Sequence, residues 1–257
     1  MTRILITGAA GRIGTRLTRQ LANRYDLVLT DRIPIDDACG CTVIPGDIAD
    51  IECARQMVQG IDTVVHLAAN PDEYADWERL LQPNIIGLYN IFAAADAAKC
   101  RRVIFASSIH AIMGYPADIQ VSTTMPVRPL DLYGATKAWG EAVARYYADQ
   151  RGLSAICLRL GWVIDRDDPA IQINLDTLST RHDGDDLDMM LTYDDLVRLV
   201  EAGIEAPESL RFGIFHGISD NRWKRLDISD ACAVLGYRPQ DDVFAIAASR
   251  LSHEVLV

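Results

Sequence analysis

Short apolar runs alternate with segments of helical periodicity along most of the chain. The apolar runs are nearly continuous and predict six buried β-strands, at residues 3–7, 26–30, 42–47, 62–69, 101–108 and 153–161. Apolar residues at helical spacing predict intervening helices at residues 12–24, 50–59, 83–98 and 131–151. Strands without a polar face are covered on both sides, and right-handed crossovers between them make them parallel. We therefore predict an α/β fold with a doubly wound parallel sheet.

The pattern weakens after residue 161. Residues 165–188 include DRDD and RHDGDD and predict a long loop or short broken helices, which often carry function. Beyond this loop we expect a helix at 193–206, a strand at 211–217, a short helix at 227–235 and a last helix at 241–251. This portion is too small to fold alone. We therefore divide the chain into a sheet domain, 1–160, and a small substrate-capping region, 161–257, that is not independent.

A glycine-rich turn joins the first strand to the first helix. Gly8, Gly11 and Gly14 form the pattern G-x-x-G-x-x-G, with Arg12 and Ile13 inside it. Glycines allow a tight turn that approaches a pyrophosphate closely, and the helix N-terminus offers free N–H groups and a positive dipole end. The turn predicts a Rossmann-type sheet and makes residues 1–160 an NAD-binding domain.

Acidic residues follow the second and third strands. Asp31 stands where a carboxylate can accept hydrogen bonds from the adenosine ribose hydroxyls, which favours NAD over a 2′-phosphorylated cofactor. Arg32 adjoins it and leaves NADP as an alternative. Asp47 can hold the adenine amino group with Ile48 against the ring, or it is an ordinary turn residue.

A tyrosine and a lysine share one face of the helix predicted at 131–151. Tyr133 and Lys137 are four residues apart, and an ammonium beside a phenol lowers its pKa toward neutrality. Such a tyrosine can take a proton from an alcohol while a hydride leaves the same carbon. Ser108 ends the fifth strand and can hold the substrate oxygen. The alternatives are a helix-surface contact and a serine that caps a turn.

The net charge and the cysteine content of the chain argue against several classes of binding partner. The 257 residues carry a formal net charge of −11, which argues against nucleic acid and anionic membranes because both attract basic patches. The six cysteines include no C-x-x-C pair, so we expect reduced structural thiols and no metal site. The first residues read as a strand rather than a leader peptide, and we expect a cytoplasmic location.

Together these motifs resemble the extended short-chain dehydrogenase/reductase family, which includes the NAD-dependent epimerases and dehydratases. The resemblance covers essentially the whole chain and implies a serine–tyrosine–lysine catalytic set at the three positions above. It also implies that the backbone of Leu67, Ala68 and Ala69 lines the cofactor and that Asn84 supports the site.

Within that family, several runs are similar to those of uronate dehydrogenases and haloarchaeal-type glucose-6-phosphate dehydrogenases. The runs are NIIGLYN (84–90), FASSIHAIMGY (105–115), PVRPLDLYG (126–134), GISDN (217–221) and LGYRPQDD (235–242). This likeness implies oxidation of a free or phosphorylated sugar at its anomeric carbon to a lactone.

The resemblance assigns Ser108, Tyr133 and three further positions to the substrate. The chain departs from the pattern at two of those three. Ile109 replaces an asparagine, His110 is kept, and Trp162 replaces a serine. Asn70, Pro71 and Asp72 follow the fourth strand and are weaker candidates to border the substrate. A smaller or neutral sugar fits Ile109 and Trp162 better than an anionic one.

The arginine that pairs with a uronate carboxylate has no evident counterpart. Counting back from residues 192–194 reaches Asp185, and Arg166 or Arg181 would have to substitute.

Two other functions compete with the sugar dehydrogenase. One is a sugar-nucleotide epimerase or dehydratase, which the short C-terminal region disfavours. The other is a non-enzymatic NAD-sensing module, which has no need of a complete catalytic set. For either enzyme we expect a homodimer, with the helices at 83–98 and 131–151 paired and the small side chains of AAADAA, 93–98, at the contact.

Overall fold

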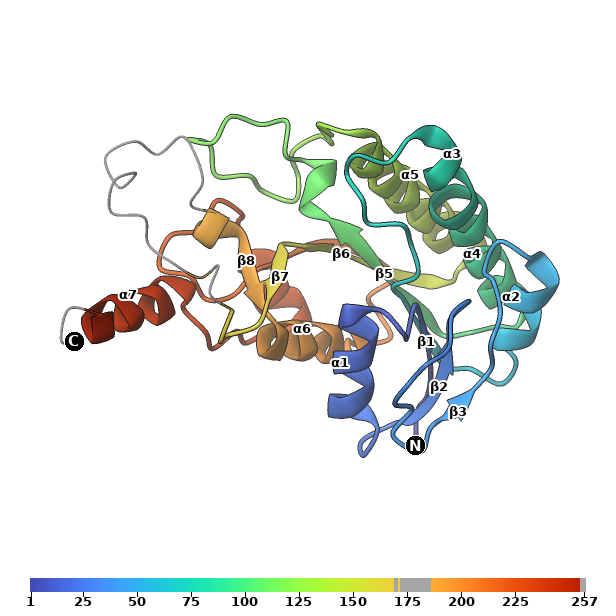
Figure 1. The fold of residues 1–257 in the computed structure, drawn as a ribbon. Helices are drawn as coiled ribbons and strands as arrows, with labels where there is room; N and C mark the ends of the chain where they lie inside the picture. Colours follow the sequence, from blue (N-terminus) through green and yellow to red (C-terminus); the bar gives the residue numbers. More distant parts are fainter. Residues whose placement is uncertain (169–170, 172–185, 255–257) are drawn as a thin grey trace.

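A seven-stranded parallel sheet forms the centre of the computed structural model, which describes residues 1–168, 171 and 186–254. The strand order is β3-β2-β1-β4-β5-β6-β9, and every neighbouring pair is parallel (Figure 1). The strands are β1 (Arg3–Thr7), β2 (Asp26–Thr30), β3 (Thr42–Val43), β4 (Thr63–His66), β5 (Arg102–Ser108), β6 (Ser154–Leu160) and β9 (Phe212–Gly217). The order reverses between β1 and β4, which confirms the doubly wound Rossmann-type sheet.

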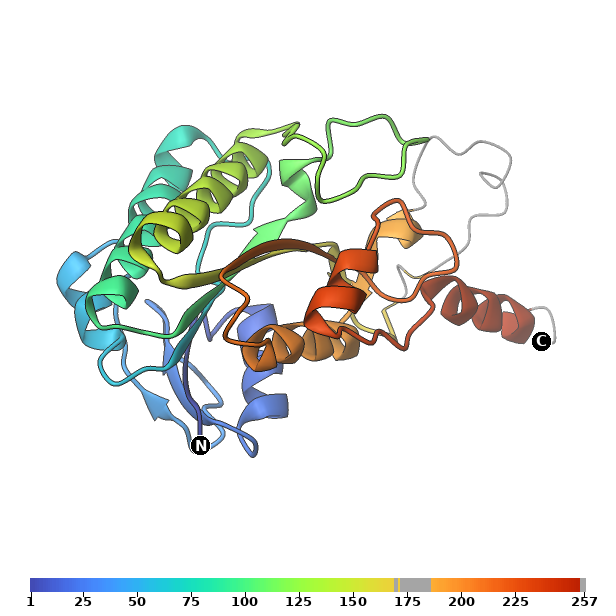
Figure 2. The ribbon, with the colours of Figure 1, turned by 180° about the vertical axis from the view of Figure 1, so that it is seen from behind.

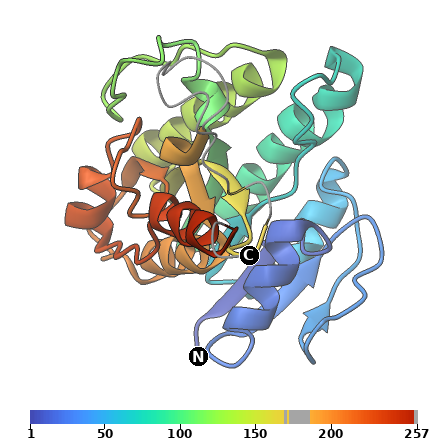
Figure 3. The same ribbon diagram turned by 60° about the vertical axis from the view of Figure 1, so that its left-hand side comes forward.

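Helices cover both faces of this sheet. Figures 1 and 3 place α1 (Arg12–Leu21) and α6 (Tyr193–Glu205) on one face, and α2 (Ile51–Met57), α4 (Leu88–Ala97) and α5 (Leu132–Tyr146) on the other. The strands are apolar on both sides, so successive residues pack into opposite layers. In β1, Ile4 and Ile6 join the core under α1 and α6, whereas Leu5 joins the core under α2 and α4.

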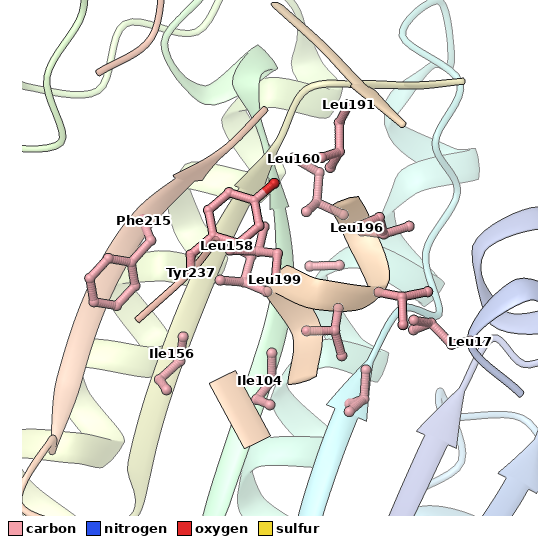
Figure 4. Close-up of a cluster of buried hydrophobic side chains, with 14 of the residues drawn as sticks. Leu17, Ile104, Ile156, Leu158, Leu160, Leu191, Leu196, Leu199, Phe215 and Tyr237 are labelled. Atoms are coloured by element: carbon pink, nitrogen blue, oxygen red, sulfur yellow. The ribbon is translucent and has the colours of Figure 1, made fainter. Parts of the chain in front are cut away.

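The core beneath α1 and α6 is shown in Figure 4. Leu17 of α1 and Leu199 of α6 are fully buried and meet Ile104 of β5 and Ile156 of β6 in the same cluster. Each fully buried leucine or isoleucine stabilises the fold by roughly 1.5–3 kcal/mol. This packing fixes α1, and with it the glycine turn at its start.

Several elements differ from the sequence prediction. The strand predicted at 42–47 keeps regular pairing only at Thr42–Val43, although the N–H groups of Ile44 and Gly46 still bond to β2 and its end. The helix predicted at 83–98 begins with a π-helical segment, Leu81–Gly87, before α4. This segment contains Pro83, which has no N–H to donate to an α-helical ladder.

The other predicted helices match with shifted ends, except that the helix predicted at 227–235 is confined to Ala231–Leu235. A short helix, α3 (Trp77–Leu80), precedes the π-helical segment and was not predicted. A second π-helical segment, Tyr147–Arg151, follows α5 and ends at Gly152, whose φ is +77°. Within the described residues, no helix combines the length and apolar character needed to cross a bilayer.

The C-terminal portion adds a small sheet that the sequence pattern did not predict. Strands β7 (Trp162–Ile164) and β8 (Met190–Thr192) pair in parallel, and α7 (Val243–Glu254) packs beside them. Figure 2 shows this portion from behind, with α7 extending away from the main sheet. Because β9 and α6 also belong to the main sheet and its cover, residues after 161 are built into the fold. Most of the loop predicted at 165–188 lies outside the described residues.

A buried ion pair ties α5 to the sheet. Arg159 of β6 donates to Glu141 of α5 through Nε to Oε1 and through Nη2 to Oε2, both at 2.8 Å. The hydroxyl of Ser107 in β5 donates to the same Oε1 at 2.7 Å. Both charged side chains are almost fully buried, so each depends on the other for compensation.

We therefore expect Glu141→Gln to lower the free energy of unfolding by about 3–5 kcal/mol, because it leaves the Arg159 charge buried and uncompensated. The double variant Glu141→Leu/Arg159→Leu should lose less than the single variant, since no charge remains. Urea unfolding of the three proteins measures this. A single variant within about 1 kcal/mol of wild type, or a double variant that loses more, contradicts the interpretation.

Candidate active site

A cavity of about 480 Å³ opens where β1, β4, β5 and β6 end at their carboxyl edges. Ligands of doubly wound sheets bind at this edge. Most of the residues predicted for the site line it: Gly8, Gly11, Arg12, Ile13, Gly14, Asp31, Arg32, Asp47, Ile48, Leu67, Ala68, Ala69, Ser108, Tyr133, Lys137 and Trp162. The lining of this cavity does not include Asn84, Ile109 or His110.

The glycine turn leaves space that any side chain would fill. Gly8 has a φ of +72°, and a Cβ there would lie 2.8 Å from the Ala68 nitrogen. A Cβ on Gly14 would lie 2.3 Å from the Gly8 oxygen, so α1 approaches the turn as closely as glycine allows. No side chain caps the N-terminus of α1 at Gly11. The free N–H groups and the turn therefore fit the pyrophosphate of a dinucleotide.

Asp31 is held in place by the backbone on both sides. Its Oδ2 accepts from the Ala10 nitrogen at 3.0 Å, and its Oδ1 accepts from the Ile33 nitrogen at 3.2 Å. These bonds fix the carboxylate at the end of β2, beside the glycine turn. The Asp47 carboxylate is exposed and accepts from the Ala49 nitrogen at 2.9 Å, which gives it the geometry of a turn residue at the cavity wall.

Three buried polar side chains converge where β5 ends and α5 begins. Ser108 hydrogen-bonds the hydroxyl of Tyr133, and Tyr133 and Lys137 stand one turn apart on α5. The Lys137 Nζ donates to the Ala106 carbonyl at 2.7 Å and lies 5.4 Å from the centre of the Tyr133 ring. A serine, a phenol and an ammonium thus lie together in one cavity wall.

Burial dominates the ionisation of this group. It raises the pKa of Tyr133 to about 12, although the hydrogen bond from Ser108 opposes the shift. Burial also lowers the pKa of Lys137 to about 7, against the attraction of the Glu141 carboxylate. The sequence argument expected a tyrosine pKa lowered toward neutrality. The structure instead has a raised one, because removal from water disfavours the phenolate.

Two predicted site residues, Ile109 and Asn84, are buried in contacts with the rest of the protein. Ile109 is 1% exposed and belongs to the core under α1 and α6. The Asn84 side chain is also buried; its Oδ1 accepts from the Asn70 nitrogen at 2.7 Å, and its Nδ2 donates to the Asn70 oxygen and the Thr136 hydroxyl, both at 3.0 Å. Asn84 therefore connects the segment after β4 to α5.

His110 lies behind the cavity wall with both ring nitrogens near carboxylates. Its Nδ1 shares a 2.7 Å hydrogen bond with Asp131, and its Nε2 lies 3.4 Å from Glu73. The imidazole packs edge-on against two lining residues, with ring centres 5.3 Å from Tyr133 and 5.5 Å from Trp162. Sequence reasoning proposed His110 but missed Glu73, because a lone glutamate in a loop carries no motif.

Other lining residues were not among the site residues that the sequence predicted. Val163 belongs to β7, and Tyr193 begins α6 directly after β8. Pro71, a weaker candidate, also lines the cavity. Arg166 pairs with Asp241 at 3.2 Å. Arg181 and Asp185 lie outside the described residues.

Comparison with known proteins places these features in a family. The model of the NAD-dependent epimerase/dehydratase family matches residues 4–167. A uronate dehydrogenase of Pseudomonas putida is 37% identical over 93% of this chain and 84% of its own length. Two Haloferax volcanii proteins cover similar shares: an NAD-dependent glucose-6-phosphate dehydrogenase at 33% identity (93% of each chain) and an L-arabinose 1-dehydrogenase at 32% (94% of this chain, 98% of its own).

A solved structure agrees with the fold. The crystal structure of a uronate dehydrogenase variant from Agrobacterium tumefaciens, complexed with NAD, superposes with a TM-score of 0.83. The two chains are 33% identical, and the match covers 99% of this chain and 89% of the other. The family resemblance inferred from the motifs is confirmed, and so is its narrower likeness to uronate and glucose-6-phosphate dehydrogenases.

The depressed pKa of Lys137 predicts a pH dependence of stability. The unfolded chain keeps this lysine protonated up to its ordinary pKa of 10.5, whereas the native protein releases the proton near pH 7. Unfolding therefore takes up a proton between these values, and the contribution of Lys137 to stability rises with pH in that window. Between about pH 7 and about pH 9.5, wild type should gain on the order of 3 kcal/mol relative to Lys137→Met.

Urea unfolding without added dinucleotide, at the two pH values, measures this difference. Lys99→Met serves as the control because the Lys99 side chain is 79% exposed. A difference between wild type and Lys137→Met that stays constant across the window contradicts the depressed pKa.

Proposed function

The chain belongs to the NAD-dependent epimerase/dehydratase family, and we propose that it is a dehydrogenase that oxidises a sugar at its anomeric carbon to a lactone. The observation that carries this proposal is the convergence of Ser108, Tyr133 and Lys137 at one cavity with the glycine turn. NAD supplies the hydride acceptor when it is bound. The substrate class comprises aldoses, uronates and sugar phosphates.

Each of the three side chains has a defined task in this proposal. The Ser108 hydroxyl holds the oxygen of the reacting alcohol beside Tyr133. The Tyr133 oxygen takes the proton from that alcohol while the carbon is oxidised. Because burial raises the pKa of Tyr133, proton transfer depends on nearby positive charge, which Lys137 supplies from within the same wall when it is protonated.

The cofactor would be held by groups already fixed in the fold. The N-terminus of α1 and the turn of Gly8, Gly11 and Gly14 would bind the pyrophosphate. The backbone-anchored Asp31 would accept from the adenosine ribose, with Asp47 and Ile48 beside the adenine. Residues 161–257 would then close the substrate end, since Trp162, Val163 and Tyr193 line the same cavity.

An epimerase of sugar nucleotides remains the second candidate in this family. Similarity to sugar dehydrogenases over most of the chain favours the dehydrogenase. The two activities differ in one observable: a dehydrogenase releases NADH in proportion to substrate, whereas an epimerase ends its cycle with the dinucleotide unchanged.

We further propose a homodimer and a cytoplasmic location. Ile86, Tyr89 and Tyr146 are exposed on α5 and on the helical segments before it, where an apolar contact with a second copy would cover them. The small residues expected at this contact are largely used inside the fold, since Ala94 and Ala95 are buried in the core. The six free cysteines suit a reducing compartment.

Tyr133→Phe tests the catalytic assignment. Without the phenol oxygen there is no acceptor for the alcohol proton, so kcat should fall on the order of 1,000-fold. The measurement is NADH formation with neutral aldoses, uronates, sugar phosphates and UDP-sugars. Binding of NAD should stay within about threefold of wild type. The control is Tyr146→Phe, which alters an exposed tyrosine on the same helix. Turnover by Tyr133→Phe near the wild-type rate refutes the assignment.

Asp31→Asn tests the cofactor preference. The substitution keeps the size of the side chain and removes the charge that repels a 2′-phosphate. We expect the ratio of kcat/KM with NADP+ to that with NAD+ to rise about tenfold or more. Asp36→Asn removes a charge from the same exposed loop and serves as the control. An equal change in both variants, or wild type that prefers NADP+, contradicts the role given to Asp31.

A further inference from the structure

Two carboxylates converge on His110, behind the part of the cavity wall that Tyr133 and Trp162 form. Asp131 meets Nδ1 at 2.7 Å, and Glu73 lies 3.4 Å from Nε2. Asp131 is fixed because its other oxygen, Oδ1, caps α5 by accepting from the Gly134 nitrogen at 2.6 Å. Glu73 belongs to the segment after β4. Helix α5 and a sheet-end loop thus place two acids around one imidazole.

This cluster is negative whatever the protonation state of His110. Two ionised carboxylates face at most one imidazolium, so one negative charge remains even when the histidine is protonated. Two negative charges remain when it is neutral. The argument therefore needs no assignment of the histidine.

Two cations close to the cluster are engaged elsewhere. Arg79, which follows Glu73 in the chain, pairs with Asp72 at 2.9 Å. Lys137 Nζ lies 5.4 Å from the centre of the Tyr133 ring and donates to the Ala106 carbonyl. Among the residues that the structure describes, none of these cations neutralises the Glu73–His110–Asp131 cluster.

Two aromatic rings connect the cluster to the cavity. The imidazole packs edge-on against Tyr133, which carries the reacting hydroxyl, and against Trp162, whose ring lines the cavity. A sugar held at Tyr133 therefore lies one ring away from the acids. Like charges repel, and they do so more strongly where a bound substrate excludes water. Hydroxyl groups, in contrast, can donate hydrogen bonds to carboxylates.

We propose that Glu73, with Asp131 and His110, makes this a site for an uncharged polyhydroxy sugar and selects against sugars that bear a carboxylate or a phosphate. This inference rests on the proposed function and narrows its substrate class. The Trp162 ring, 36% exposed, offers a flat apolar surface to the same neutral ring. Overall likeness does not decide the question, since the similar proteins include enzymes named for anionic sugars and one named for L-arabinose.

The test compares sugars that share a ring and differ at C6, where one member of each pair bears an anionic group. We would measure kcat/KM of wild type for glucose, glucuronate and glucose 6-phosphate, and for galactose and galacturonate, with NAD+. A chelator is present throughout, because the three ligand atoms lie within 4.8 Å of one another and a divalent cation there would reverse the local charge. Wild type should favour the neutral member of a pair by about tenfold or more.

Glu73→Gln should reduce that preference about fivefold or more, chiefly by raising kcat/KM for the anionic sugar. Glu78→Gln removes the same charge from exposed α3 and should leave the preference within about twofold, since its charge is screened by solvent. The KD for NAD, measured on each variant, should match wild type and so establishes that both variants are folded.

The outcomes separate the two levels of the proposal. Wild type that prefers the uronate or the phosphate over the neutral sugar overturns the charge selection and leaves the dehydrogenase intact. Equal effects of Glu73→Gln and Glu78→Gln overturn the role of Glu73. Absence of NADH formation with every sugar refutes the proposed function, and the charge selection with it.

Discussion

The ion pair between Glu141 and Arg159 holds α5, the helix that carries Tyr133 and Lys137. It anchors α5 from below to β6, and Ser107 adds a bond from β5. Lys137 and Tyr133 stand one and two turns before this anchor along α5, and Lys137 adds its own bond to the Ala106 carbonyl. A buried pair contributes little net stability compared with a well-packed apolar one. The pair instead fixes the position of α5, because the helix cannot slide or rotate over the sheet without breaking these bonds.

The same burial that fixes the site makes its charges costly. Burial favours the neutral forms of both Tyr133 and Lys137, so the site resists the phenolate and the ammonium alike. The serine hydrogen bond and the Glu141 carboxylate oppose these shifts only in part. The fold thus provides a preorganised arrangement of uncharged or barely charged groups, and small changes of nearby charge have large effects on it.

Much of this arrangement follows from local patterns. The apolar strands determine a sheet buried on both faces, and the glycine turn, Asp31 and the Tyr133–Lys137 spacing each stand at a strand or helix end that the pattern locates. Individual contacts do not follow. Ile109 looked like a substrate contact from its motif position, but it faces the core. The strands β7 and β8 were missed because three residues each give no periodicity. The direction of the Tyr133 pKa was wrong because spacing along a helix carries no information about burial.

Overall sequence similarity says little about the charge of the substrate in such a fold. The sheet and its covering helices are determined by many residues acting together, so the fold is similar in a protein that shares a third of its sequence. The charge at the substrate end depends on a few side chains in loops that follow single strands. One glutamate beside His110 adds a negative charge near this end of the cavity, at little cost to the packing of the sheet. Specificity can therefore diverge while fold and reaction chemistry stay the same.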